Sequence, residues 1–284
     1  MLDKINNPND IKKLSFDELN QLSNEIRNAL IENTKKTGGH LGSNLGTVEL
    51  TIAMHFVFDT PKDSFIWDVG HQAYAHKMLT GRNKSMSTLR KLNGISGFTK
   101  IAESEHDAFG AGHSSTSISA ALGISLANRL NNKNDIAIAV IGDGALTGGM
   151  AFEALNHAGD TDANLLIILN DNDMSISKNV GALSKYLTKL ISGKLYSTVK
   201  TKSLKLLEGL PRIQDFAKRW EEHAKGMILP GTLFEELGID YFGPIDGHDI
   251  HTLIKTLQNL KNHNKPRILH VITKKGQGME DLEN

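Results

Sequence analysis

The stretch that decides the fold is AIAVIGDGALTGGMAFEALNHAGDTDANLLIILNDND, from Ala137 to Asp173. Its two apolar runs, AIAVI and LLIIL, are typical of buried strands, and GGMAFEALNHAG between them is typical of a helix. A strand, a helix and a second parallel strand form one right-handed unit whose strands end at the same edge of the sheet. Asp143 and Asn172, which are 172 − 143 = 29 positions apart, are therefore expected to converge there.

A carboxylate and an amide oxygen suit Mg²⁺, with water, a backbone carbonyl or a phosphate completing its octahedron. Gly144 lets the chain turn closely, and the following helix directs free N–H groups at a phosphate. The segment GDGALTG is neither G-x-G-x-x-G, because Thr147 holds the sixth position, nor a Walker loop. The alternative is that Gly and Asp simply form a turn.

Strand-like and helix-like segments alternate along the rest of the chain, which predicts a parallel α/β sheet with helices on both faces, in three layers. The other predicted strands are SFIWDV and RILHVIT. Helices are expected at 15–36, where Ser15 and Glu18 form a capping box, and at 47–58, 72–81, 118–130 and 248–260, with a loop at 110–117 leading into the helix at 118–130. We expect one domain over 1–284, with a mobile helical insert at about 183–230.

Composition excludes several classes of protein. Lys plus Arg and Asp plus Glu both number 32, so the zero formal charge argues against nucleic acid or an anionic membrane as the main partner. The absence of cysteine excludes disulfides, thiolate metal sites and cysteine nucleophiles. No apolar run reaches the ~20 residues that cross a bilayer. We expect a cytoplasmic protein.

The histidines His40, His71 and His113 each follow a glycine in a loop. Loops at a sheet edge carry function, and histidine can donate to phosphate or move protons near neutral pH. A zinc site at His71 and His76 is the alternative, although their spacing of five does not match H-E-x-x-H. Ser114 and Ser115 are expected to cap the next helix. A further group of histidines is expected to pack in the interior or lie on the surface: His55, His106, His157, His223, His251, His263 and His270.

The segments around the two strand ends resemble those of a known superfamily. IGDGALTGGMAFEALNHAGD with ILNDNDMSIS resembles the thiamine-diphosphate and magnesium motif of the transketolase superfamily. Other segments resemble the 1-deoxy-D-xylulose-5-phosphate synthase family in particular, from about residue 10 to 278: GGHLGSNLGTVELTIAMHFVFDTP, IWDVGHQAYAHKMLTGR, GHSSTSISAALGI, GTLFEELGIDYFGPIDGHD and HVITKKGQG.

The resemblance implies a thiamine-diphosphate-binding fold, with Mg²⁺ held by Asp143, Asn172 and the carbonyl of Met174. It implies that His40 and His71 lie near the reacting carbon. Further cofactor contacts are implied at His71, Gly112, His113, Ser114, Gly144, Ala145 and Asn172. At position 279 the family usually has a tyrosine that contacts the cofactor, and here Met279 stands there.

The resemblance further implies condensation of pyruvate with D-glyceraldehyde 3-phosphate to 1-deoxy-D-xylulose 5-phosphate and CO₂, a precursor of isoprenoids, thiamine and pyridoxal phosphate. Family members are about twice as long, and nothing here matches their pyrimidine-binding and carboxy-terminal domains. Three interpretations stay open: an amino-terminal part of the synthase, a natural subunit of a split transketolase-type enzyme, or a non-catalytic cofactor-binding or assembly module. We expect a homodimer or pairing with a chain that supplies the pyrimidine-binding domain, and no activity from this chain alone.

Overall fold

The structure is a computed structural model that describes residues 1–172 and 232–279. The expected helical insert at about 183–230 lies outside the described residues. So does Met174, which was predicted to offer a carbonyl to the metal.

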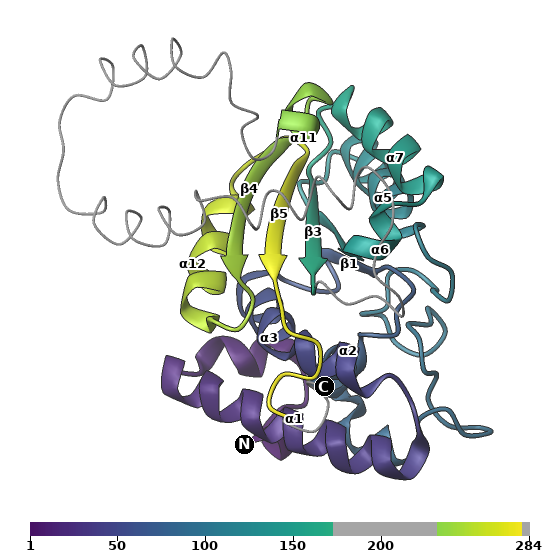
Figure 1. Cartoon of the computed structure of the whole chain (residues 1–284), viewed down its shortest axis with the longest axis vertical. Coiled ribbons are helices and arrows are strands. Elements are labelled where there is room, and N and C mark those ends of the chain that lie inside the picture. Colours follow the sequence, from purple (N-terminus) through teal and green to yellow (C-terminus); the bar gives the residue numbers. More distant parts are fainter. Residues whose placement is uncertain (173–231, 280–284) are drawn as a thin grey trace, which may run out of the picture.

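The described residues form one parallel sheet of five strands in the order β1-β2-β3-β5-β4. Figure 1 shows the strands running side by side with helices on both sides. The parallel three-layer α/β prediction is confirmed. The strands are β1 (Ser64–Trp67), β2 (Ala137–Gly142), β3 (Leu165–Asp171), β4 (Asp240–Asp246) and β5 (Arg267–Ile272).

The predicted helices are present, most of them shorter than expected. The segment at 72–81 is helical only in part, because Thr80 and Gly81 leave helical geometry. The α-helices are α1 (Phe16–Thr37), α2 (Leu41–Gly46), α3 (Val48–Val57), α4 (Tyr74–Lys77), α5 (Ser117–Leu130), α6 (Asp143–Leu146), α7 (Gly149–Gly159), α11 (Thr232–Glu236) and α12 (Ile250–Lys261). The capping box of α1 is confirmed, since the Glu18 amide donates to the Ser15 hydroxyl and the Ser15 amide donates to the Glu18 carboxylate.

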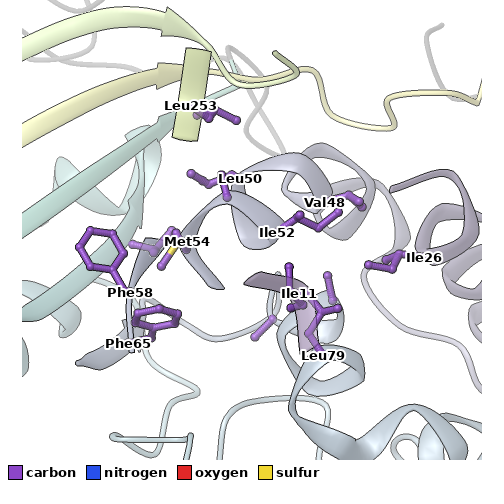
Figure 2. Close-up of a cluster of buried hydrophobic side chains, with 14 of the residues drawn as sticks. Ile11, Ile26, Val48, Leu50, Ile52, Met54, Phe58, Phe65, Leu79 and Leu253 are labelled. Atoms are coloured by element: carbon purple, nitrogen blue, oxygen red, sulfur yellow. The ribbon is translucent and has the colours of Figure 1, made fainter. Parts of the chain in front are cut away.

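Successive side chains of the central strands enter two different cores, because side chains alternate between the faces of a strand. On β2, Ile138 and Val140 join the cluster under α1, α3 and α12, whereas Ala139 and Ile141 join the cluster under α5 and α7. Figure 2 shows part of the first cluster, where Met54 of α3 lies near Phe58 and Phe65. Burial on both faces explains why these strands are continuously apolar.

Strand β4 was not predicted as a strand. It lies at the edge of the sheet, its residues are mostly half-buried, and its register with β5 shifts between Phe242 and Ile245. Gly243 and Pro244 occupy the shift. Proline cannot donate to a sheet ladder and is tolerated at edges and bulges, so the segment lacks the apolar pattern of the central strands.

The fold brings several segments to the carboxyl edge of the sheet. The loop after β1 begins at Asp68, helix α6 begins at Asp143 directly after β2, and β3 is followed by Asn172. Open α/β sheets bind ligands at this edge. Among the helices that the structure describes, none combines the length and apolar character needed to span a membrane.

Candidate cofactor and metal site

Asp143 and Asn172 leave the sheet at the same edge. Strands β2 and β3 pair in parallel up to the partners Gly142 and Asn170, so Asp143 follows the last pair by one residue and Asn172 by two. The sequence expectation that the two strand ends meet at one edge is confirmed. The expected helix GGMAFEALNHAG is present as α7, from Gly149 to Gly159. Asp143 is buried and begins an additional short helix, α6, which was not expected.

The rings of His40 and His71 lie together although 31 residues separate them, since 71 − 40 = 31. Their centroids are 5.3 Å apart and their planes meet at 74°. Burial, together with the nearby His40 and Lys275, lowers the pKa of His71 to about 4. Burial and Arg90 also lower the pKa of His40. Both rings are therefore neutral at physiological pH and can donate or accept one proton each.

Asn44 joins the backbones that carry these two histidines. Its side-chain amide donates to the carbonyl of His40 and to the carbonyl of His71, at 2.7 Å in both cases. Its side-chain oxygen accepts from the Tyr74 amide at 2.8 Å. Asn44 is completely buried, and both donors of its amide are used to hold the two histidine loops.

The loop before α5 presents Gly112, His113 and Ser114 at the surface. Gly112 has φ +142°, and a Cβ placed there would meet nothing within 4 Å. The helix α5 begins at Ser117 with Thr116 as N-cap, and no side chain of that residue caps it. The expected capping by Ser114 and Ser115 is wrong, because Ser115 turns into left-handed geometry at φ 68° and its hydroxyl donates to the Ala145 carbonyl.

The segment after β5 passes beside the two histidines. The Gly276 amide donates to the Gly42 carbonyl at 2.9 Å, two residues beyond His40. Arg27 donates from Nε to the Gln277 carbonyl at 2.9 Å and pairs with the buried Glu49. Met279 is half-buried against the cluster of α1 and α3. Its contact with a cofactor stays a prediction.

The zinc alternative is not supported by the surroundings of His76. Its ring is completely buried, with Nδ1 bonded to Nε2 of His55 at 3.0 Å and Nε2 bonded to Asp107 at 3.1 Å. Both nitrogens are thus occupied by protein groups. Within 1–172 and 232–279, no cluster of three His, Cys, Asp or Glu side chains could hold a metal ion.

The histidines expected to pack or lie on the surface do so where the structure describes them. His55 and His270 are fully buried, and His270 bonds to Asp171 at 3.0 Å and to Tyr241 at 2.7 Å. His157 and His251 are exposed. His223 lies outside the described residues.

Sequence reasoning missed Asn44 and Asp68, which hold the site loops, and gave Ser115 a different role. Each is a buried polar residue next to a glycine-histidine segment. A buried polar group must find hydrogen-bond partners, so a polar residue inside an otherwise apolar or glycine-rich run is the signal that could have singled them out.

The residues at this edge fit thiamine diphosphate with Mg²⁺. The Nδ1 atom of His71 is buried and has no hydrogen-bond partner among the described residues, so it is available to a ligand. The open space at Gly112 lets a ligand approach the backbone closely. Asp143 and Asn172 supply the oxygen atoms that Mg²⁺ prefers.

Solved structures share this architecture. Transketolase from Campylobacter jejuni superposes with a TM-score of 0.67 over 95% of this chain and 39% of that one, at 19% sequence identity. Transketolase from Leishmania mexicana gives a TM-score of 0.66 over 92% of this chain and 37% of its own, at 18% identity. The fold is the α/β thiamine-diphosphate-binding fold of transketolases.

Sequence comparison identifies the family to which the chain belongs among proteins with this fold. Residues 2–273 match the profile of 1-deoxy-D-xylulose-5-phosphate synthase, and the chain belongs to that family. The synthase of Thioalkalivibrio sulfidiphilus is 59% identical over 283 residues, which are 100% of this chain and 44% of that protein. The synthase of Pseudomonas fluorescens strain Pf0-1 is 58% identical over 100% of this chain and 45% of its own length. The chain therefore spans less than half the length of these relatives.

Proposed function

We propose that this chain carries the diphosphate- and Mg²⁺-binding part of an enzyme that condenses pyruvate with D-glyceraldehyde 3-phosphate to 1-deoxy-D-xylulose 5-phosphate and CO₂. The product would supply isoprenoid, thiamine and pyridoxal phosphate synthesis. The observation that carries the proposal is the gathering, at one sheet edge, of the His40–His71 pair and the segments after β1, β2 and β3. Membership of the synthase family supports the choice of substrates.

In this proposal Asp143 and Asn172 ligate Mg²⁺, with the carbonyl of Met174 as third protein ligand. The diphosphate would be held by Gly112, His113 and Ser114 together with Gly144, Ala145 and Asn172. Bound thiamine diphosphate supplies the electron sink that decarboxylation of a 2-oxo acid requires.

The two histidines act as proton donors and acceptors near the reacting carbon. Because burial keeps the pKa of His71 at about 4, the ring is neutral at pH 7 and its unpartnered Nδ1 can form a hydrogen bond with the ligand. His40 is exposed beside it and can donate to an oxygen that gains negative charge. Asn44 fixes both loops, so the rings keep their mutual position without the ligand.

Calorimetric titration of the chain with thiamine diphosphate, in the presence and absence of Mg²⁺, tests the proposal. We expect binding that requires Mg²⁺. The matched control titrates thiamine, which lacks the diphosphate and is expected to bind far more weakly. Failure to bind thiamine diphosphate at any Mg²⁺ concentration would contradict the assignment.

The activity itself is proposed to require residues beyond these 284. The relatives are more than twice as long, and in this family a glutamate of the pyrimidine-binding domain is expected to activate the cofactor. An assay with both substrates, cofactor and Mg²⁺, run with and without a separately expressed pyrimidine-binding domain, separates the interpretations. Synthesis only in the mixture supports the interpretation that the chain is a part or a subunit of the enzyme. Absence of synthesis in both assays favours the non-catalytic module. Robust synthesis by the chain alone would contradict the proposal.

We further propose a cytoplasmic homodimer, or a complex with a chain that supplies the pyrimidine-binding domain. Phe152 and Met150 at the start of α7, next to the proposed diphosphate site, are each about half exposed, at 47% and 51%. Apolar side chains exposed beside a site are typical of a surface that another domain covers. Sedimentation velocity of the chain, alone and with the added domain, measures this association.

A further inference from the structure

Asp68 is a buried carboxylate that no sequence motif singles out. It follows β1 directly, and its own amide donates to the Val140 carbonyl, which places it in register with β2. Its side chain is 1% exposed. A carboxylate this deeply buried must be fully hydrogen-bonded.

Both carboxylate oxygens of Asp68 bind the loop before α5. Oδ1 accepts from the Ser115 amide at 2.8 Å, and Oδ2 accepts from the Ser117 amide at 3.0 Å. Ser117 is the first residue of α5, which has no side-chain cap from its own N-cap residue. Asp68 therefore serves as a cap supplied by another strand, where the helix dipole also favours a negative charge.

Ser115 continues this connection to helix α6, which follows β2. Its hydroxyl donates to the Ala145 carbonyl at 2.7 Å. A Cβ on Gly148 would lie 2.2 Å from that hydroxyl, so the serine occupies space that only a glycine at 148 leaves open. Asp68 and Ser115 thus tie together the end of β1, the loop before α5 and helix α6.

The exposed span Gly112–Ser114 lies between two anchors. On one side the Ala111 amide donates to the Thr99 carbonyl at 3.1 Å, and on the other the Ser115 amide donates to Asp68. Between them, the only hydrogen bond in the described chain is the one from the Thr116 hydroxyl to the His113 carbonyl, at 3.2 Å. The position of the span therefore depends on its anchors.

We infer that Asp68 and Ser115 are positioning residues that hold Gly112–Ser114 beside Gly144 and Ala145 of α6, the two segments proposed to bind the diphosphate. This inference rests on the proposed function for the identity of the ligand. Neither residue needs to touch the ligand, because both act through backbone atoms of the two segments.

The test uses the full chain and two conservative variants. In Asp68→Asn an NH₂ group must face one of the two amide donors, so one hydrogen bond is lost without a change of shape. Ser115→Ala removes only the hydroxyl bonded to Ala145. Ser119→Ala, at an exposed position on α5, is the matched control. Hydrogen exchange of the peptide spanning 109–118 and calorimetric titration with Mg²⁺ and thiamine diphosphate are measured for each, well below the unfolding temperature.

We expect faster exchange in 109–118 for Asp68→Asn, and cofactor affinity at least about tenfold lower in both variants, because each loses a hydrogen bond worth roughly that factor. The preference for thiamine diphosphate over thiamine monophosphate should shrink, which a general loss of stability would not cause. The double variant should lose less than the product of the single effects, since both residues act on one span.

Unchanged affinity in both variants, or losses that multiply fully in the double variant, would overturn the inference. If the unchanged chain binds no thiamine diphosphate, the proposed function fails, and the exchange measurement still decides the role of the anchor. If the chain binds no thiamine diphosphate, unchanged hydrogen exchange in 109–118 for Asp68→Asn would overturn the inference that Asp68 anchors this span.

Discussion

The imidazole of His71 lies edge-on against that of His40, at a centroid distance of 5.3 Å, and its Nδ1 atom has no partner within the part of the chain that the structure describes. The pair is held from behind by Asn44, which binds both backbone carbonyls. The arrangement leaves one neutral ring with a vacant hydrogen-bonding atom next to a second, more exposed ring.

The first prediction concerns the pKa of His71. The folded value of about 4 is below the ordinary value of 6.5, so between these pH values the unfolded chain binds more protons. The contribution of His71 to stability is therefore complete above pH 6.5 and is lost as pH falls towards 4, with a slope of up to about 1.4 kcal/mol per pH unit. His71→Asn should flatten the pH dependence of urea unfolding in this window.

The exposed His157 provides the control, because His157→Asn should leave the slope unchanged. NMR titration gives a direct check. In His40→Ala the His71 resonance should titrate at a higher pH than in the unchanged chain, since the variant removes a neighbouring charge and opens the ring to water. Titration of His71 near its ordinary pKa in the unchanged chain would contradict the burial argument.

The second prediction concerns Asn44. Asn44→Asp replaces the NH₂ donor with an oxygen that faces two carbonyls, so two hydrogen bonds become repulsive contacts. A cost of roughly 2–4 kcal/mol in unfolding free energy is expected from two lost hydrogen bonds at a buried site. Asn20→Asp, at an exposed position on α1, should cost far less. Equal stability of the two variants would show that Asn44 does not hold the histidine loops.

The third prediction concerns the metal. Asp143→Ala removes the only carboxylate of the proposed ligand set and should abolish Mg²⁺-dependent binding of thiamine diphosphate. Asn172→Ala should weaken it, because one neutral oxygen ligand is lost. Calorimetry measures both, with Asp160→Ala after α7 as the control. Wild-type affinity for thiamine diphosphate in both variants would contradict the assignment of the Mg²⁺ site to this sheet edge.

The fourth prediction concerns Asp107, which lies away from the proposed ligands. Burial alone would raise its pKa, but hydrogen bonds from His76 and Arg82 hold that pKa well below the usual range. Arg82 donates to both of its oxygens at 2.8 Å. In Asp107→Asn the buried guanidinium keeps Glu103 as its one charged partner within the part of the chain that the structure describes. We therefore expect a cost near or below the lower end of the about 3–5 kcal/mol typical of a fully broken buried ion pair.

Chemical denaturation of Asp107→Asn tests this, with the exposed Glu105→Gln as the matched carboxylate-to-amide control. The control should change stability by less than about 1 kcal/mol. The low pKa of Asp107 contributes to the stability of the fold above pH 3.8, and this contribution is lost on acidification. The unchanged chain and Asp107→Asn should therefore converge in unfolding free energy at acidic pH. A difference in unfolding free energy that persists at low pH would mean that packing, not charge, accounts for the destabilisation of Asp107→Asn.

The sequence by itself determined the layers of this fold and the edge that carries the site. Continuous apolar runs such as AIAVI and LLIIL are typical of strands buried on both faces, and the helix between them places Asp143 and Asn172 at the same edge. The edge strand β4 was hidden because Gly243 and Pro244 interrupt its pattern. A strand that is half exposed and irregular carries little periodic signal.

Only the tertiary structure decided how the loops are held. Ser115 was expected to cap the helix that follows it, yet the cap comes from Asp68, 47 residues earlier in the chain, and the serine binds Ala145 instead. Likewise, nothing local reveals that Asn44 joins His40 to His71. Hydrogen bonds between segments distant in sequence depend on where the sheet brings those segments, and that placement follows from the packing of the whole core.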